Sequence, residues 1–570
     1  MRIPALTGED TLRPLGTYVA ANQIPFVFRA AAPAFLLAAF PFLLPAQEPP
    51  QNDTEVDLEE PAEPGYVSRL EVDLEGVEMS LADVVLLAFS QNLDIQLQAI
   101  DVQISEDEID IADSIYDPVL GAGFSHTERQ QEITQRQAGE TITGTSETRT
   151  ESYSASLSQL IPSGATASVG FTSDRTTLRG AREPFAVYNP AETQRAFVRL
   201  TQPLLRNFGP MVTNRGLRIS RIQEEATRAL YRQEIDDRLA DVMDAYWDLV
   251  FAIRNLEVQT ASLEAAEELA RVNEARVDAG VAPRTELLQA RAQEAERRND
   301  VIRARAAILA SQDALLSILN WTGDLETWDQ PILPVDTPDL YDADIELQDP
   351  GLIDMAISRR QDFRASELGI DIAKINQDVA RWQRLPELNA FVELGASGFD
   401  DNRSDAFDDV TATHYQDYSY GLEFRYPIPN RRARAEYRQS QHRHDRAEVD
   451  VRRAELMLVT QVRNATRTLR TALDNIEATE AQVEAAQETL ESERRRLEVG
   501  AATTFNVLEF QEALARAQVA QVDALVNYQK GLIELERSTG NLLDAVGREL
   551  GLEFDLDERV TESAWRGPDY

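Results

Sequence analysis

The chain contains two copies of one pattern of segments. Over the first part of each copy the residues match at a shift of 268, as for Pro118 and Pro386. Over the second part the shift is 220, as for Gly280 and Gly500. Other pairs that keep these shifts are Ala88 with Ala356, Leu120 with Leu388, Ala245 with Ala465, and Leu249 with Leu469. A constant shift over ordered landmarks indicates a duplication, so we expect two similar units.

A long helical stretch in each copy is interrupted once, at a glycine. Before the break, apolar residues and alanine recur at intervals of seven. They are Leu256, Leu263, Ala270 and Val277 in the first copy, and Ile476, Val483, Leu490 and Leu497 in the second. A sustained period of seven predicts coiled-coil packing. Gly280 and Gly500 then mark the tips of helical hairpins, because glycine readily adopts the positive φ that ends a helix.

The lengths of these helical stretches predict how they are arranged. At about 1.5 Å per residue, a helix over residues 214–279 is roughly 100 Å long. Residues 80–115, which begin at the plausible cap Ser80, and residues 285–320 predict helices of roughly 54 Å each. Two short helices stacked end to end match one long helix. We therefore expect a cylinder wall that is built from continuous and composite helices.

Segments between the helices alternate apolar and polar residues. Tyr418, Tyr420, Leu422 and Phe424 alternate with Ser419, Gly421 and Glu423, and residues 388–394, 153–157 and 165–171 follow the same pattern. Strands of a transmembrane barrel alternate in this way, with lipid outside and water inside. Half-buried strands of a soluble sheet alternate similarly. The pattern by itself leaves both possibilities open.

The N-terminal composition is typical of an exported protein. Arg2, Arg13 and Arg29 precede an apolar run over residues 30–46, which prolines interrupt and which is shorter than the roughly 20 residues of a spanning helix. Residues 1–46 are therefore interpreted as a signal peptide, and the acidic, proline-rich residues 47–78 as a tether. An exported chain without another long apolar stretch can enter a membrane only as a β-barrel.

Charge and motif content exclude several classes of function. The 570 residues carry a net charge of −42, which argues against binding nucleic acid, and the absence of cysteine excludes disulfides and cysteine-ligated zinc. His442 and His444 are two residues apart and would point to different faces of a helix. Residues 400–409 lack the glycine of a calcium loop and are expected to form an exposed loop between two strands. No catalytic motif is found, so we expect neither an enzyme nor a cofactor or metal site.

The order of these features resembles the TolC family of outer-membrane efflux proteins over about residues 79–545. The resemblance includes "QNLDIQL" and "RRQDFRA" at helix entries, "YDPVL" and "LPELN" before a strand, "TQPLL" and "RYPIP" after one, and the tip glycines. It implies a mixed α and β membrane protein, in which a transmembrane β-barrel is continued by a long coiled-coil α-helical barrel and three copies assemble. The first repeat would span 79–320, an equatorial segment 321–346, the second repeat 347–545, and a C-terminal tail 546–570.

The resemblance also implies a function and partners. The homotrimer would be a passive exit duct in the outer membrane, in contact with its lipid, and its helices would lie in the periplasm. It would conduct substrates outward from a periplasmic adaptor and an inner-membrane transporter, in tripartite efflux or type I secretion. The alternative is a periplasmic coiled-coil scaffold protein with a soluble β domain.

The resemblance places two groups of residues at the periplasmic tips. The residues expected to contact the adaptor are Gly280, Val281, Ala282, Gly500, Ala501 and Ala502. The residues expected to form the entrance constriction are Glu286, Gln289, Asn506 and Glu509. A tyrosine and an arginine that lock the mouth in the best-known member would fall at Leu497 and Ala502, so that lock is not retained. The alternative for Glu509 is a position on a solvated helix face.

The first repeat departs from the family by its length. The difference between the two shifts makes it 48 residues longer than the second repeat, and the excess lies between its first strand and its long helix. The segment "ETRTESYSASLSQLIPSGATASVGFTSDRTT" provides about two strands more than the usual pair. These strands could enlarge the barrel, extend from it as an external hairpin, or pack elsewhere, and the sequence leaves this choice open.

Overall fold

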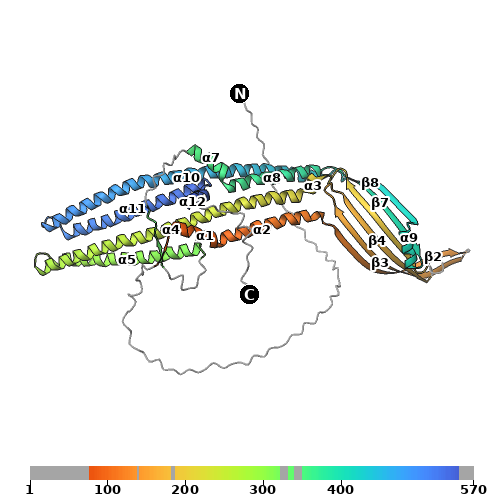
Figure 1. The fold of residues 1–570 in the computed structure, drawn as a ribbon, viewed down its shortest axis with the longest axis horizontal. Helices are drawn as coiled ribbons and strands as arrows, with labels where there is room; N and C mark the ends of the chain where they lie inside the picture. Colours follow the sequence, from red (N-terminus) through yellow and green to blue (C-terminus); the bar gives the residue numbers. More distant parts are fainter. Residues whose placement is uncertain (1–75, 138–139, 181–185, 321–330, 339–348, 551–570) are drawn as a thin grey trace, which may run out of the picture. The chain divides into compact units, whose positions relative to one another are not determined.

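The computed structural model of the chain describes residues 76–137, 140–180, 186–320, 331–338 and 349–550 (Figure 1). The chain divides into two units, Met1–Val67 and Ser68–Tyr570, and every described residue belongs to the second. The expected signal peptide and most of the expected tether lie outside the described residues. The same holds for residues 551–570 and for most of the expected equatorial segment.

The helices follow the duplicated order that the sequence predicts. The first repeat contributes α1 (Leu81–Gln91), α2 (Leu93–Asp113), the short helix η1 (Ser114–Tyr116), α3 (Pro210–Thr213), α4 (Arg215–Asp278) and α5 (Arg284–Ile318). The second contributes α7 (Asp349–Arg359), α8 (Gln361–Trp382), α9 (Arg403–Thr411), α10 (Arg431–Glu498), α11 (Thr504–Ser538) and α12 (Leu542–Leu550). Among the described residues, no helix combines the length and apolar character that crossing a membrane requires.

The single helix expected over residues 80–115 is wrong, because the structure divides it at Asn92. Ser80 caps α1 as expected, in a reciprocal capping box with Asp83. The Asn92 side chain then accepts hydrogen bonds from the N–H groups of Asp94 and Ile95, at 2.9 and 3.1 Å, and so begins a new helix. Arg360 lies at the boundary of α7 and α8, which is the matching position at a shift of 268.

The expected end-to-end stacking of short helices is confirmed in both repeats (Figure 1). Asn92 donates a hydrogen bond of 2.8 Å to the carbonyl oxygen of Ile318, which joins the start of α2 to the end of α5. In the second repeat Gly540, just after α11, lies against the start of α8. A Cβ atom on Gly540 would come within 3.1 Å of the backbone nitrogen of Arg360. Each repeat therefore has one continuous helix and one composite helix.

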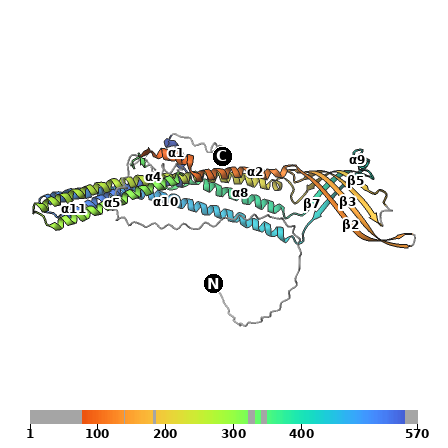
Figure 2. The ribbon, with the colours of Figure 1, turned by 90° about the horizontal axis from the view of Figure 1, so that it is seen from below.

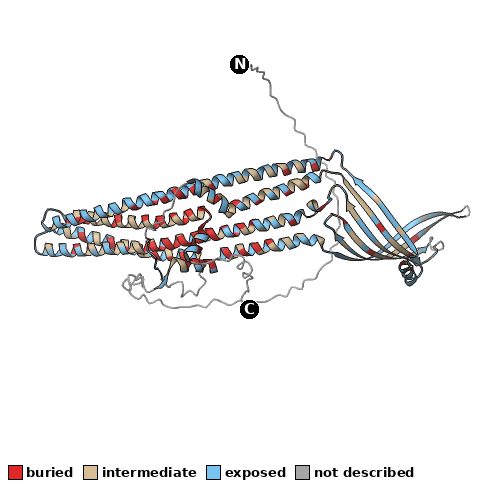
Figure 3. Ribbon diagram, turned by 45° about the horizontal axis from the view of Figure 1, so that its top comes forward, coloured by how far each residue is buried: buried red, intermediate tan, exposed pale blue. Residues whose placement is uncertain are grey.

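Buried side chains concentrate in the middle of the helical part (Figure 3). The main cluster forms where α4 packs against α1, α5 and α12, and it includes Val84, Leu239, Tyr246, Leu315 and Leu542. A smaller cluster joins α10 to α11 through Ala465, Leu469, Ala472 and Tyr528. Toward the tips and toward the sheet, more of the helix surface is exposed.

Six antiparallel strands form one sheet in the order in which they occur in the chain. They are β2 (Val119–Gln137), β3 (Glu140–Leu160), β4 (Thr166–Gly180), β5 (Ala191–Pro203), β7 (Glu387–Asp400) and β8 (Tyr415–Arg425). The additional strands of the first repeat are β3 and β4, and they lie within the sheet between β2 and β5. A separate parallel pair, β1 (Val77–Met79) and β6 (Ile332–Pro334), lies beside α1.

One face of this sheet is apolar and the other is polar. A single row of paired residues crosses all six strands on the apolar face, and every member is exposed. The row is Leu120, Leu157, Val169, Val198, Leu394 and Tyr418, with exposed fractions between 47% and 78%. A row on the other face contains Ser158, Ser168, Arg199, Glu393 and Ser419. The alternation expected from the sequence is confirmed, and the apolar side chains face outward from the sheet rather than into a core.

The exposed loop expected at residues 400–409 is wrong, because most of this segment forms α9. Asn402 caps the helix by accepting a hydrogen bond of 3.1 Å from the N–H of Ser404. Ala406 and Val410 are buried, and the helix packs against β5 and β7. Gly398 makes this packing possible, since a Cβ atom there would come within 1.9 Å of the carbonyl oxygen of Ala406.

Candidate channel mouth at the helical tips

Both hairpin tips end their first helix with the same backbone turn. The φ angles of Gly280 and Gly500 are 74° and 72°, so the positive φ expected at these glycines is confirmed. The residue after each glycine donates a hydrogen bond to a carbonyl oxygen five residues earlier in the helix. Val281 donates to the carbonyl oxygen of Arg276 at 2.9 Å, and Ala501 donates to that of Arg496 at 2.7 Å. This paired pattern is the Schellman ending of an α-helix.

The tips expose apolar side chains. No atom lies within 4 Å of a Cβ placed on Gly280 or Gly500, so backbone conformation rather than space requires glycine there. Large hydrophobic residues around the two turns are also exposed. They are Val281 at 69%, Leu288 at 67%, Val499 at 78% and Phe505 at 58%. We call these four residues the tip patch. Exposed apolar patches on a protein surface commonly mark a contact with a partner.

A buried hydroxyl group connects the two tips. Thr504 of α11 is fully buried, and its Oγ1 lies 3.0 Å from Oδ1 of Asn273 on α4 and 3.0 Å from Oε2 of Glu286 on α5. This contact is not among those predicted from the sequence. Asn273 lies three residues after Ala270, at the second core position of the heptad. A polar residue at a core position usually needs a buried partner, and this was the sequence signal for the contact.

Apolar packing supports the same junction. Leu269 of α4 and Leu490 of α10 are buried with Val507 and Leu508 of α11. The two hairpins are therefore in contact near their tips, which lie at the same end of the helical part in both views (Figures 1 and 2).

The four residues expected at the constriction fall into two pairs according to their exposure. Glu286 and Asn506 occupy equivalent positions and are half-buried. Glu286 accepts from Thr504, whereas Asn506 donates its N–H to Thr503 Oγ1 at 3.4 Å and accepts at Oδ1 from that hydroxyl at 3.0 Å. Gln289 and Glu509 are also equivalent, and both are exposed. The first pair is held within the tip structure, and the second pair faces solvent.

Neighbouring carboxylates near the tips have basic partners. Arg496 lies 2.5 Å from Glu493, and Arg291 lies 2.7 Å from Glu274. Within the described part of the chain, no ion pair is formed by Glu509. Its charge is therefore not balanced by a neighbouring arginine, unlike the charges of Glu493 and Glu274.

A buried carboxyl group lies farther from the tips, where α12 meets α4. Asp236 is 6% exposed and accepts a hydrogen bond of 3.0 Å from the N–H of Leu543. Burial, together with the nearby charges of Asp237 and Asp544, raises the pKa of Asp236 to about 7, although the Leu543 N–H and Arg360 act in the opposite direction. We therefore expect the stability of this junction to depend on pH.

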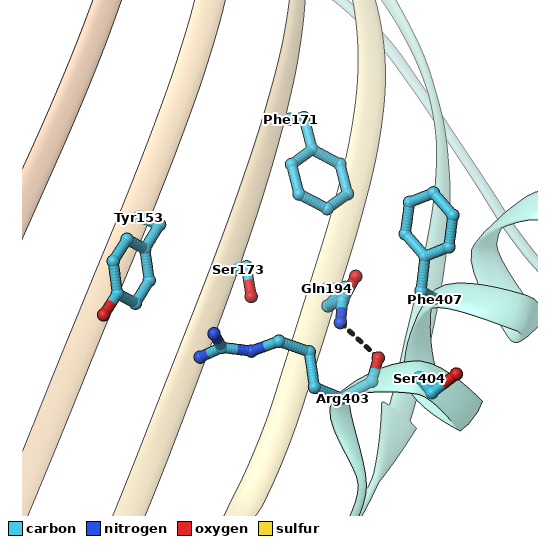
Figure 4. Close-up of a pocket in the computed structure, with 7 residues that line it drawn as sticks. All are labelled: Tyr153, Phe171, Ser173, Gln194, Arg403, Ser404 and Phe407. Atoms are coloured by element: carbon cyan, nitrogen blue, oxygen red, sulfur yellow. Dashed lines mark hydrogen bonds between the residues drawn. The ribbon is translucent and has the colours of Figure 1, made fainter.

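An open hollow lies at the far end of the apolar face, where α9 covers the sheet (Figure 4). It is lined by Tyr153, Phe171, Ser173, Gln194, Arg403, Ser404 and Phe407. Gln194 donates to the carbonyl oxygen of Arg403 at 2.7 Å, and Arg403 lies over the ring of Tyr153. Ser173 and Gln194 continue the strand positions of Phe171 and Ala196, so the apolar face becomes polar here. The helix α9 covers this polar end.

A comparison with protein-family models decides between a channel and a scaffold. The model described as "Outer membrane efflux protein" matches residues 166–320 and 352–541, which is more than half of the chain. The chain belongs to the outer membrane efflux protein family. It is an outer-membrane channel with a periplasmic helical extension, and it is not an enzyme. The alternative of a periplasmic scaffold protein is thereby excluded.

Individual relatives of this efflux channel are distant in sequence and similar in fold. The outer membrane protein TolC of Vibrio cholerae is 22% identical over 302 residues, which cover 53% of this chain and 67% of that protein. The Campylobacter jejuni CmeC outer membrane channel has a TM-score of 0.60 at 17% identity, covering 84% of this chain and 90% of that one. The open state of the Neisseria gonorrhoeae MtrE outer membrane channel has a TM-score of 0.56 at 16% identity, and the match covers 81% of this chain and 89% of that one.

Proposed function

We propose that this efflux channel is the passive exit duct of a tripartite efflux or type I secretion system, and that three copies form it. The row of six exposed apolar residues across the sheet carries the proposal. Such a row faces lipid when the sheet curves into a barrel, and the polar row behind it then faces water. The helices continue this water-filled path through the periplasm.

Closure of the duct requires several copies. One chain supplies two continuous helices, α4 and α10, and two composite ones, which are too few to enclose a tunnel. Its sheet likewise has two open edges. We take the three-fold symmetry from the family resemblance. A homotrimer then has one shared barrel in outer-membrane lipid and one helical tunnel.

The tips are the proposed contact with the periplasmic adaptor. The tip residues Gly280, Val281, Ala282, Gly500, Ala501 and Ala502 carry the contact. The exposed tip patch supports this role, because an apolar partner surface would remove those side chains from water. The adaptor links the duct to an inner-membrane transporter, which supplies the energy. Glu286, Gln289, Asn506 and Glu509 form the entrance constriction, and Glu509 supplies its unpaired charge.

A double substitution at the tips tests this function. Val281→Asp with Val499→Asp places charge in the proposed adaptor contact. Val187→Asp is the control, because Val187 is 86% exposed and lies in the loop between β4 and β5, at the opposite end from the tips. In cells whose own copy of the channel is deleted, we expect the tip variant to lose resistance to a panel of toxic compounds. The Val187 variant should retain that resistance. Mass measurement in mild detergent should give a trimer for both variants. Full resistance in the tip variant, or a monomeric mass for the unmodified protein, would contradict the proposal.

A further inference from the structure

The sheet leaves two strand edges without a partner. Within the described sheet, β2 pairs only with β3 and β8 pairs only with β7. Both edges extend along strands long enough to cross a membrane, since β2 has 19 residues and β8 has 11. Unpaired backbone N–H and C=O groups are not tolerated in lipid. If the apolar face lies in the membrane, each edge must pair with another strand.

The directions of the strands fit a partner of the same kind. β2 begins next to the helices and runs away from them, whereas β8 returns to the helices and ends at Arg425, six residues before α10. Because the sheet has an even number of strands, β2 of one copy and β8 of the next are antiparallel. Both also present their apolar residues on the same face, as Leu120 and Tyr418 show.

The first strands of the sheet carry the same apolar face as the later ones. Leu120 and Phe124 on β2 are exposed at 78% and 63%, and Tyr153 and Leu157 face the same side from β3. The rings of Phe124 and Tyr153 are 5.0 Å apart. A hairpin in water would have no reason to expose this apolar strip. The strip instead continues the apolar face of β4, β5, β7 and β8 without a break.

We propose that β2 of each copy pairs with β8 of the next, so that three copies close one barrel of eighteen strands, six from each. This inference rests on the trimer of the proposed function. It resolves the choice that the sequence left open, because the 48 additional residues enlarge the barrel. At strand spacings of about 4.8 Å and a tilt of about 40°, eighteen strands enclose a cylinder roughly 36 Å across, against roughly 24 Å for twelve.

The duplication predicts the register of this contact. Within one chain the last strand of the first repeat, β5, pairs with the first strand of the second repeat, β7. The contact between copies joins the last strand of the second repeat, β8, to the first strand of the first repeat, β2. In the internal contact Arg199 is opposite Glu393. Aligning "TQPLL" with "RYPIP" maps Arg199 to Glu423, and the shift of 268 maps Glu393 to Ser125. Ser125 is therefore opposite Glu423 of the next copy.

Cysteine cross-linking tests both the contact and its register. The chain has no cysteine, so an introduced pair reacts without background. Ser125→Cys with Glu423→Cys places both thiols on the polar face, where a disulfide needs Cα atoms roughly 4.4–6.8 Å apart. Oxidation of the assembled protein should give dimers and trimers that survive heating in SDS and disappear on reduction. Ser125→Cys with Ser419→Cys is the matched control, and we expect at least a tenfold lower yield from it.

A second cysteine pair tests the alternative of a twelve-stranded barrel. Asp174 of β4 lies in the same cross-strand row as Ser125. If β2 and β3 stood outside a twelve-stranded barrel, β4 would form the edge, and Asp174→Cys with Glu423→Cys would link instead. That outcome would overturn the inference and leave the trimer intact. A trimer without links from Gly123→Cys, Ser125→Cys or Thr127→Cys to position 423 would also overturn it. A monomeric mass for the unmodified protein would refute the proposed function itself.

Discussion

At the scale of single residues, the tip glycines are required by their backbone angle alone. Gly500→Val should strain the turn by about 1–2 kcal/mol, because a β-branched residue tolerates positive φ poorly. Space is not the reason, since nothing lies near the added Cβ. We expect a lower thermal midpoint and reduced export in cells, while insertion into the outer membrane is retained.

Two controls separate this backbone effect from the effect of added bulk. Gly500→Asn should be nearly neutral, because asparagine enters the left-handed region more readily. Gly216→Val adds the same side chain at an open helical position with an ordinary φ and should leave export unchanged. If export is the same for Gly500→Val and Gly500→Asn, the turn does not determine coupling to the adaptor.

The Thr504 hydroxyl group should be important for the junction between the tips. Thr504→Val keeps the shape and removes the hydroxyl that lies 3.0 Å from both Asn273 Oδ1 and Glu286 Oε2. Both acceptors lose this donor, which costs about 1–3 kcal/mol. Thermal unfolding should show a lower midpoint for this variant. In the double variant with Asn273→Leu, the loss should be smaller than the sum of the two single losses. Simple additivity of the two changes would show that these side chains do not interact.

Glu509 provides the test of the constriction. Three copies would bring three such carboxylates around one axis, where a narrow pore favours cations. We expect a cation-selective channel in planar bilayers, with conductance reduced by divalent ions, and we expect Glu509→Gln to weaken both properties without loss of trimer. Glu498→Gln changes a carboxylate on the preceding helix and should have little effect. Unchanged reversal potentials for Glu509→Gln would place Glu509 on a solvated helix face.

Residue-level prediction from the sequence succeeded where a residue has one physical reason. Gly280 and Gly500 were identifiable because a positive φ after a helix strongly favours glycine. Thr504 was not identifiable, because a threonine at the start of a helix is usually interpreted as a cap. In α11 the cap is the preceding residue, Thr503. Its partner Asn273 is distant in the sequence. Only the packing of the two hairpins brings these residues together.

At the scale of secondary-structure elements, the junction of α4 and α12 should make stability depend on pH. Asp236 holds its proton up to about pH 7 in the folded chain, against an ordinary value of 3.8. Between these values the folded state binds a proton that the unfolded state lacks, so stability falls as pH rises. A shift of three units corresponds to the order of 4 kcal/mol. Asp236→Asn should therefore match the parent near pH 4 and unfold at a higher temperature at pH 8.

The control for this prediction is Asp278→Asn, which removes one carboxylate from the exposed end of α4. It should leave the pH dependence of the thermal midpoint as it is in the parent. A constant difference between Asp236→Asn and the parent from pH 4 to 8 would show that the buried carboxyl does not titrate in this range.

Boundaries of elements were harder to predict than their existence. The long helices before the tips were predictable, because a seven-residue period from Leu256 to Val277 and from Ile476 to Leu497 has few alternatives to a coiled-coil helix. The break at Asn92 was not predicted, although Asn92 itself caps α2, because the same side chain also contacts the end of α5, more than 200 residues later in the chain. Similarly, α9 forms because β5 and β7 bury Ala406 and Val410, and a nine-residue polar segment gives little sign of this.

At the scale of the whole molecule, the distal part of the β2–β3 hairpin should be dispensable. The apolar face of β2 ends at Phe124, and the following positions on that face are His126, Glu128 and Gln130. This distal part lies beyond the apolar band. Replacing residues 129–148 by an Asn-Gly turn should keep trimer yield and conductance. Extending the deletion to residues 123–154 removes part of the band and should abolish the trimer.

The number of strands was the part of the architecture that the sequence could not determine. Alternation predicted which residues share a face, and the structure confirms it, yet strands such as β3 alternate in the same way inside or outside a barrel. The pairing of Leu157 with both Leu120 and Val169 joins residues that are far apart in the sequence. It places β3 within the sheet, and no local pattern contains that information.

The position of the inserted strands has an evolutionary consequence. An inserted pair leaves the directions of β2 and β5 unchanged, so every other connection in the ancestor could remain as it was. An odd number of added strands would have reversed one repeat relative to the other. In the eighteen-stranded barrel that we propose, one added hairpin per copy widens the outer opening and leaves the helices that meet the partners unchanged. The aperture and the docking end can evolve as independent traits.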